Sequence, residues 1–137
     1  MQLTKNFNLS EFLFSRFYDS ESQLRVIKEF MHDKEAQENV KVLAENLQVL
    51  RDEVGKSIQI NIAYRPKWWE LKQGRSGNSK HCLGMAADII VNGEDAHLIH
   101  DKIEKLIKAG KMQQGGLGKY SSFTHYDVRG VKARWNG

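Results

Sequence analysis

The sequence contains one cysteine and one proline among 137 residues, and both shortages exclude some architectures. With Cys82 alone, no disulfide can form within the chain, and a metal site built from several cysteine thiolates is excluded. No stretch has the composition of a linker, and no repeat or low-complexity tract divides the chain. We therefore expect residues 1–137 to form a single domain that is large enough to bury its own core.

Long apolar runs are also missing from the sequence. No segment approaches the roughly 18 consecutive apolar residues of a membrane-spanning helix. The first residues, "MQLTKNFNLSEF", lack the basic start and the apolar core of a signal peptide. We expect a protein without a membrane span that is synthesised in the cytoplasm without a signal peptide.

Neither sign of charge dominates the chain. The net charge is +4 at pH 7, but from Val26 to Lys56 the basic residues are interleaved with acidic ones, and only the tail "RGVKARWNG" is basic without acids. This balance suits an anionic partner such as a cell-wall polymer. Because no nucleic-acid recognition motif accompanies the basic residues, we expect no nucleic-acid partner.

Apolar periodicity predicts a helical first half. Residues 10–18 begin with Ser10 as a helix cap, and the clearest helix covers about residues 37–54, with Gly55 placed to end it. In residues 21–31, four apolar residues are predicted to share one helical face: Leu24, Ile27, Phe30 and Met31. In the long helix the apolar positions are Val40, Leu43, Leu47, Leu50 and Val54.

Alternation in the second half predicts strands. In "SIQINIAYR" the isoleucines and Tyr64 share one face and Arg65 lies on the other. A polar loop of about fifteen residues, "PKWWELKQGRSGNSK", follows with the pair Trp68 and Trp69. "ADIIV" is a buried strand, "EDAHLIHDKIEKLIKAG" an amphipathic helix, and "GGLGKY" with "FTHYDVR" a hairpin or a pair of strands. The predicted class is α+β, with a helical N-terminal half packed on a small, mainly antiparallel sheet.

The five histidines divide into two groups. His32, His97 and His100 lie in charged or amphipathic helical segments without a carboxylate at a spacing that completes a metal site, so we expect them at the surface or its boundary. His81 and His125 are each followed by an aspartate in a strand or turn context.

Two of these segments together supply the donor types that a catalytic zinc site needs, although by spacing alone the pattern is a weak one, and a loop histidine at position 81 and a helix or strand cap at position 88 are the alternatives. In "FTHYDVR", alternation places His125 and Asp127 on one face of a strand. The segment "HCLGMAAD" adds His81 and Asp88, and Gly84 with its small neighbours lets the chain turn tightly between them. Two histidines and one aspartate supply three ligands and leave a fourth position for water, and the second aspartate remains for proton transfer.

The same segments carry a family resemblance. "AYR", then "SKHCLGMAAD", then "GGLGKY" and "FTHYDVR", in this order and at this separation, resemble the zinc D-Ala-D-Ala carboxypeptidase family, which includes phage endolysins and relatives of the hedgehog signalling domain. The resemblance implies that His81, Asp88 and His125 bind Zn²⁺. It also implies that Asp127 acts as general base or orients His125.

The resemblance also implies substrate contacts. Arg65 stands in the place of a family arginine that holds a substrate carboxylate or carbonyl, and Ser79 in the place of a substrate-contacting serine. Trp68 and Trp69 either orient the peptide or anchor the loop. The implied substrate is the peptide stem of peptidoglycan, and the implied enzyme is a monomer of D-Ala-D-Ala carboxypeptidase or endopeptidase type. The sequence does not decide which peptide bond is cleaved.

Two positions depart from the family pattern. Many members have an acidic residue three positions before the last histidine, where this chain has Ser122. The identity of the general base is therefore open, and Asp127 is the residue that we expect to take that role. Ala63 replaces a common glycine without shifting Arg65.

Two other interpretations compete with the peptidase. The same zinc site could stabilise a non-catalytic wall-binding or virion module, which the serine at position 122 favours and Asp127 disfavours. A nucleophilic Cys82 is disfavoured because no local partner would orient a base toward it. If the protein is a phage lysis enzyme, it acts at the cell wall after the membrane has been opened; a cell-wall remodelling enzyme is the other setting.

Overall fold

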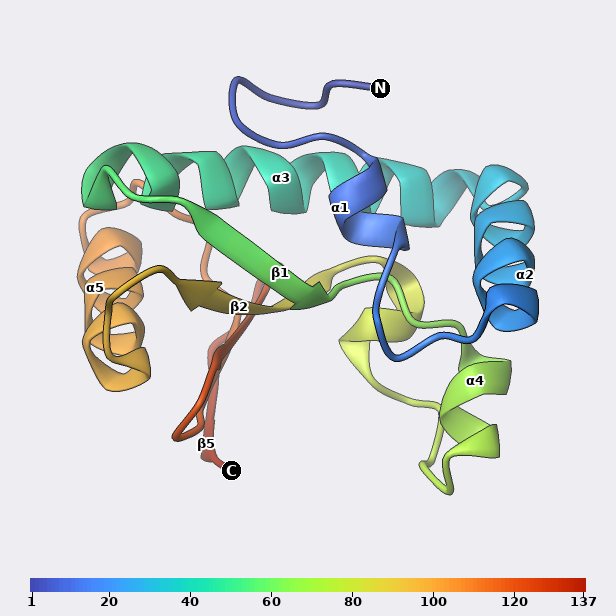
Figure 1. The fold of residues 1–137 in the computed structure, drawn as a ribbon. Helices are drawn as coiled ribbons and strands as arrows, with labels where there is room; N and C mark the ends of the chain where they lie inside the picture. Colours follow the sequence, from blue (N-terminus) through green and yellow to red (C-terminus); the bar gives the residue numbers. More distant parts are fainter.

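The computed structural model describes all residues, Met1–Gly137, as an α+β fold with five α-helices and one five-stranded sheet (Figure 1). This confirms the predicted fold class. The helices are α1 (Ser10–Leu13), α2 (Ser20–Met31), α3 (Lys34–Val54), α4 (Lys67–Lys72) and α5 (Ala96–Lys108), with a 3-10 helix η1 (Lys80–Leu83). The strands are β1 (Ile58–Ile62), β2 (Ala86–Val91), β3 (Gly116–Lys119), β4 (Thr124–Asp127) and β5 (Ala133–Asn136).

The sheet has the strand order β1-β2-β4-β3-β5, so β2 and β4 are neighbours although α5 and β3 separate them in sequence. All neighbouring strands are antiparallel except β3 and β5, which are parallel. The predicted pairing of "GGLGKY" with "FTHYDVR" is confirmed as β3 with β4. Strand β5 was not predicted, and it places the basic tail at the edge of the sheet beside β3.

Helix α3 buries more apolar residues than any other helix and runs across the molecule in Figure 1, with α2 beside its N-terminal end. It starts three residues earlier than predicted, because the Asp33 side chain caps it by accepting a hydrogen bond from Ala36 N. Gly55 ends it in the left-handed conformation, with φ 65°, as predicted. Four of the five predicted apolar positions are fully buried: Val40, Leu43, Leu47 and Leu50.

The predicted apolar face of α2 is partly wrong. Leu24 and Met31 are exposed and Ile27 is half-buried, whereas Phe30 is buried as predicted, together with Ser22 and Val26. The three buried residues are spaced by four, which places them in one row along the helix. The row packs into the core, which leaves the flanking apolar residues in solvent.

Two further local predictions need correction. The first helix is shorter than residues 10–18, because α1 ends at Leu13 and the chain continues with the exposed Phe14 and Phe17. The segment predicted as a polar loop contains α4 and the start of η1. In Figure 1, α4 lies at the lower right of the molecule, below α2.

No helix of the structure is long and apolar enough to cross a membrane.

Candidate metal centre

Strands β2 and β4 bring Asp88 and His125 together. The two residues are direct partners in the antiparallel register, so their side chains lie side by side on one face of the sheet. His125 Nδ1 lies 3.1 Å from Asp88 Oδ1. The sheet therefore positions one nitrogen and one oxygen donor without help from any loop.

His81 reaches the same point from the 3-10 helix η1. Its Nε2 lies 3.3 Å from Asp88 Oδ1, and its Nδ1–H donates to the carbonyl oxygen of Ala63 at 2.8 Å. The backbone N–H of Arg65 in turn donates to His81 O. Gly84 ends η1 with φ 75°, and a Cβ there would meet Ala36 O at 2.8 Å. The tight turn predicted between His81 and the strand is confirmed at this glycine.

The three side chains form a donor set that fits a metal ion. One ligand atom from each of His81, Asp88 and His125 lies within 4.8 Å of the others. Neutral imidazole carries one ring hydrogen, and each ring has an acceptor for it on its outer side, Ala63 O for His81 and Asp127 for His125. With the ring hydrogens in those positions, three lone-pair atoms converge, which is the arrangement of metal-binding histidines and a carboxylate.

Asp127 lies behind His125 and not beside the converging atoms. Its Oδ2 accepts a hydrogen bond from His125 Nε2 at 2.8 Å, while the other ring nitrogen of His125 faces Asp88. The Asp127 side chain has no exposed surface, and it also accepts from Arg129 through both carboxylate oxygens and from Gly116 N. A Cβ on Gly116 would lie 2.2 Å from Asp127 Oδ2, so glycine is required where this carboxylate is buried.

Both aspartates are ionised despite their burial. Burial alone would raise the pKa of Asp88, but its interactions with His81 and His125 outweigh burial and hold that pKa well below the usual value. For Asp127, burial is outweighed by the hydrogen bonds from Arg129, His125 and Gly116 N, which also hold its pKa well below the usual value. Asp88 is thus in the charged form that metal binding requires.

We call His81, Asp88 and His125 the metal cluster. A cavity of about 450 Å³ opens onto these three residues, and we call it the site cavity. His81, Asp88 and His125 line it together with residues from the segment before η1 and from the C-terminal strands. Asp88 is the only carboxylate in its lining. A ligand in this cavity would contact the three converging donors directly.

A comparison with known families agrees with this geometry. The family model described as Peptidase M15 matches residues 16–127, which is most of the chain. The chain belongs to the peptidase M15 family. The family resemblance seen in the sequence is confirmed, and no individual curated protein matches the chain.

In this M15 peptidase, Arg65 and Ser79 both line the site cavity, and both bind one buried acid that the sequence interpretation missed. Glu70, on α4, is 1% exposed and accepts from Arg65 Nε at 2.6 Å and from Ser79 Oγ. Burial alone would raise the pKa of Glu70, but these hydrogen bonds lower it. The sequence signal that could have indicated this pair is the acidic Glu70 five positions after Arg65. It was missed because the segment was predicted to be a loop, although Glu70 lies on helix α4.

The tryptophans predicted to contact substrate separate in the structure. Trp68 turns toward α2, where its Nε1–H donates to Glu29 and Arg25 stacks on its ring at 4.1 Å. It does not line the site cavity or the second cavity, of about 290 Å³, that shares part of its wall, and its contacts with α2 favour the predicted alternative of a loop anchor. Trp69 is mostly buried against Tyr18 but does line that second cavity.

The aromatic wall of the site cavity comes instead from β5 and from the turn between β3 and β4. Trp135 packs on the His125 ring at 4.9 Å between centroids and donates to the hydroxyl of Tyr120. Tyr120 stacks on Phe123 at 4.3 Å. Gly118 makes this possible, because a Cβ there would lie 2.6 Å from the Trp135 indole nitrogen. The sequence interpretation missed this wall because it left the tail without a strand.

The remaining histidines and the cysteine are where the sequence places them. His32 and His97 are exposed and His100 is half-buried, away from the metal cluster. Cys82 is half-buried, and burial together with the nearby Glu70 raises its pKa to about 11. Its thiol is therefore protonated at neutral pH, which disfavours a nucleophilic role as predicted.

Proposed function

We propose that this M15 peptidase is a zinc enzyme that hydrolyses the peptide stems of bacterial peptidoglycan, with the specificity of a D-Ala-D-Ala carboxypeptidase or an endopeptidase. The observation that carries the proposal is the convergence of the His81, Asp88 and His125 donor atoms beside an open cavity. Membership of the family supplies the reaction class. Two histidine nitrogens and one carboxylate oxygen form a ligand set of the kind found in catalytic zinc sites.

In this proposal His81, Asp88 and His125 hold the ion, and each has a defined support. Ala63 O holds the His81 ring and Asp127 holds the His125 ring, so both imidazoles present the correct nitrogen. When bound, zinc supplies a Lewis acid that polarises the scissile carbonyl and lowers the pKa of a coordinated water. The protein contributes the position of the donors and a cavity from which the substrate approaches.

Arg65 and Ser79 orient the substrate in the proposed mechanism. Because Glu70 binds the guanidinium at Nε, the terminal nitrogens of Arg65 remain available for a substrate carboxylate or carbonyl. The Ser79 hydroxyl donates to the same carboxylate, so its lone pairs remain available to accept from a substrate N–H. Glu70 thereby holds both substrate-binding groups in one geometry.

We assign Asp127 the orientation of His125 in place of the role of general base. Its two oxygens already accept from His125, Arg129 and Gly116, and it has no exposed surface from which to reach a water. A general base must lie within hydrogen-bond reach of the proton that it removes. Asp127 instead polarises and fixes the imidazole from behind.

A second candidate function is a non-catalytic zinc module that binds the wall or belongs to a virion. One observation favours it: no carboxylate other than Asp88 lines the site cavity, and Ser122 occupies the usual acid position. The peptidase remains our first proposal because the site cavity also contains Arg65 and Ser79, which have no purpose in a closed structural zinc site. A phage lysis enzyme or a cell-wall remodelling enzyme is the proposed setting.

Mass spectrometry of purified stem peptides incubated with the zinc-loaded protein tests the proposal. We expect cleavage at one bond, whose identity decides between carboxypeptidase and endopeptidase, and no cleavage by the Asp88→Ala variant. Intact peptides in the presence of zinc-loaded, folded protein would favour the non-catalytic module.

A further inference from the structure

A second cavity, of about 290 Å³, adjoins the site cavity, and we call it the side cavity. The two cavities share four lining residues: Arg65, Arg75, Asp88 and Phe123. Asp88 belongs to the metal cluster, so the side cavity begins at the position where the scissile bond would lie. Arg16, Asn61 and Trp69 continue its wall away from the cluster.

Positive charge in the side cavity exceeds negative charge. Three arginines line it, Arg16, Arg65 and Arg75, whereas Asp88 is its single carboxylate and already faces two histidines. The Nε of Arg65 binds Glu70. The side chains of Arg16 and Arg75 make no hydrogen bond and no ion pair with the protein. The cavity therefore holds two guanidinium groups with no counter-charge of their own.

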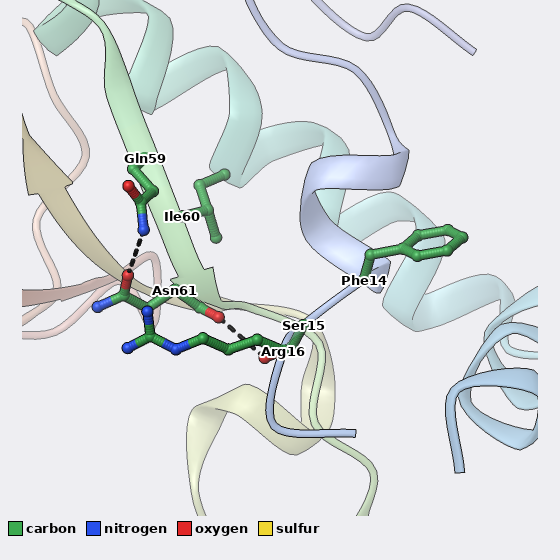
Figure 2. A pocket seen from close by; sticks show the side chains of 6 residues that line it. All are labelled: Phe14, Ser15, Arg16, Gln59, Ile60 and Asn61. Atoms are coloured by element: carbon green, nitrogen blue, oxygen red, sulfur yellow. Dashed lines mark hydrogen bonds between the residues drawn. The ribbon is translucent and has the colours of Figure 1, made fainter. Parts of the chain in front are cut away.

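Both arginines are exposed, and each lies near one aromatic ring. Arg16 lies over the ring of Phe17 at 5.0 Å, and Arg75 lies 5.9 Å from the ring of Trp69. The backbone N–H of Arg75 donates to Glu70 O, which ties its segment to α4. Figure 2 shows the Arg16 side chain running beside Asn61 at the end of β1. Guanidinium groups held this way bind a carboxylate with less loss of freedom than unsupported side chains.

A further hollow lies beside the side cavity, away from the metal cluster. Arg16 and Asn61 line this hollow of about 390 Å³ along β1, whose other walls include Phe14, Gln59 and Ile60 (Figure 2). The hollow and the side cavity therefore share Arg16 and Asn61 as wall residues. A peptide that extends beyond the scissile bond on this side has space to continue past Arg16.

We propose that the side cavity is an anion subsite in which Arg16 and Arg75 bind a carboxylate of the substrate peptide next to the bond held at the metal cluster. This inference rests on the proposed peptidase function and names a chemical requirement of its substrate. The ligand is an acidic peptide, and its uncharged carboxamide counterpart lacks the group that pairs with the two guanidinium groups.

The test compares three forms of one stem peptide: unmodified, amidated at the free carboxyl group of its glutamate, and amidated at its C-terminus. For zinc-loaded wild type we expect kcat/KM to fall at least tenfold on one of the two amidations. The variants Arg16→Gln and Arg75→Gln should each lower kcat/KM for the unmodified peptide about tenfold. In the double variant the preference for the charged peptide should fall to about one.

Arg51→Gln, on α3 and outside all three cavities, is the matched control and should leave the preference intact. Equal losses on all three peptides in the double variant, or a wild type indifferent to both amidations, would overturn the subsite and leave the peptidase function standing. If the wild type cleaves none of the peptides, the peptidase function fails. Calorimetric binding of the same peptides then decides the subsite: charge-dependent binding that the double variant loses supports it, and equal or absent binding overturns it.

Discussion

Replacing Asp127 by asparagine distinguishes a general base from a group that orients His125. In the structure both carboxylate oxygens accept hydrogen bonds, Oδ2 from His125 and Arg129 and Oδ1 from Gly116 N and Arg129. Asparagine keeps the shape but has one accepting oxygen and one NH₂ group. Whichever way the amide turns, its NH₂ group faces an N–H donor.

The size of the effect follows from these contacts. If the NH₂ group faces His125, the imidazole must present Nε2 as acceptor, and the hydrogen moves to Nδ1, the nitrogen that faces Asp88. If the oxygen faces His125, the NH₂ group meets Gly116 N and Arg129 Nε. Loss of such a partner behind a metal ligand typically weakens metal affinity by about 10- to 100-fold, which corresponds to about 1.4 to 2.8 kcal/mol.

Competition with a chromophoric chelator measures the zinc Kd of wild type and Asp127→Asn, and kcat is then compared at saturating zinc. We expect the Kd to rise 10- to 100-fold, with most of the activity recovered once the site is saturated. An unchanged Kd combined with a lost kcat would refute this reasoning and return Asp127 to the role of general base. Asp101→Asn, at an exposed position on α5, should change neither quantity and serves as the control.

Three further predictions concern the surroundings of the site. Glu70→Ala leaves the buried Arg65 without its counter-charge, so denaturant unfolding should show a loss of about 3 kcal/mol, and a loss under 1 kcal/mol would contradict the buried pair. Gly118→Ala places a methyl group against Trp135 and should cost about 1 to 3 kcal/mol with reduced activity; wild-type values would mean that this wall tolerates a Cβ. Trp68→Ala should lower stability by about 1 kcal/mol and leave KM within about twofold, whereas a large rise in KM would restore Trp68 as a substrate contact.

The metal cluster could be predicted from the sequence because its segments resemble those of a known zinc family. His81 and Asp88 lie on either side of a short glycine-containing turn and His125 lies on an alternating strand, but their spacing is a weak pattern, and the order of the motifs in the family is what joined the three residues. The structure places them together as expected. Strand alternation could not predict how the His125 ring is oriented. It placed Asp127 on the same face as His125, but it could not show that Asp127 and Asp88 lie on opposite sides of the imidazole.

The parts that sequence reasoning missed depend on contacts between distant segments. Glu70 lies on a six-residue helix, too short for a periodic signal, and its role follows only from the positions of Arg65 and Ser79. The four-residue strand β5 is fixed by pairing with β3, and this pairing brings Trp135 onto His125. The buried row of α2 is likewise chosen by packing, since its sequence offers a second apolar face.

The central claim is that His81, Asp88 and His125 form a catalytic zinc site. Zinc titration of the metal-depleted protein, with release of peptide fragments from purified peptidoglycan followed by mass spectrometry, tests it most directly. We predict that hydrolysis rises until one zinc per chain is bound and then levels off, and that Asp88→Asn shows no such rise. Full hydrolysis by the metal-depleted protein, or none with one zinc bound, would contradict the claim.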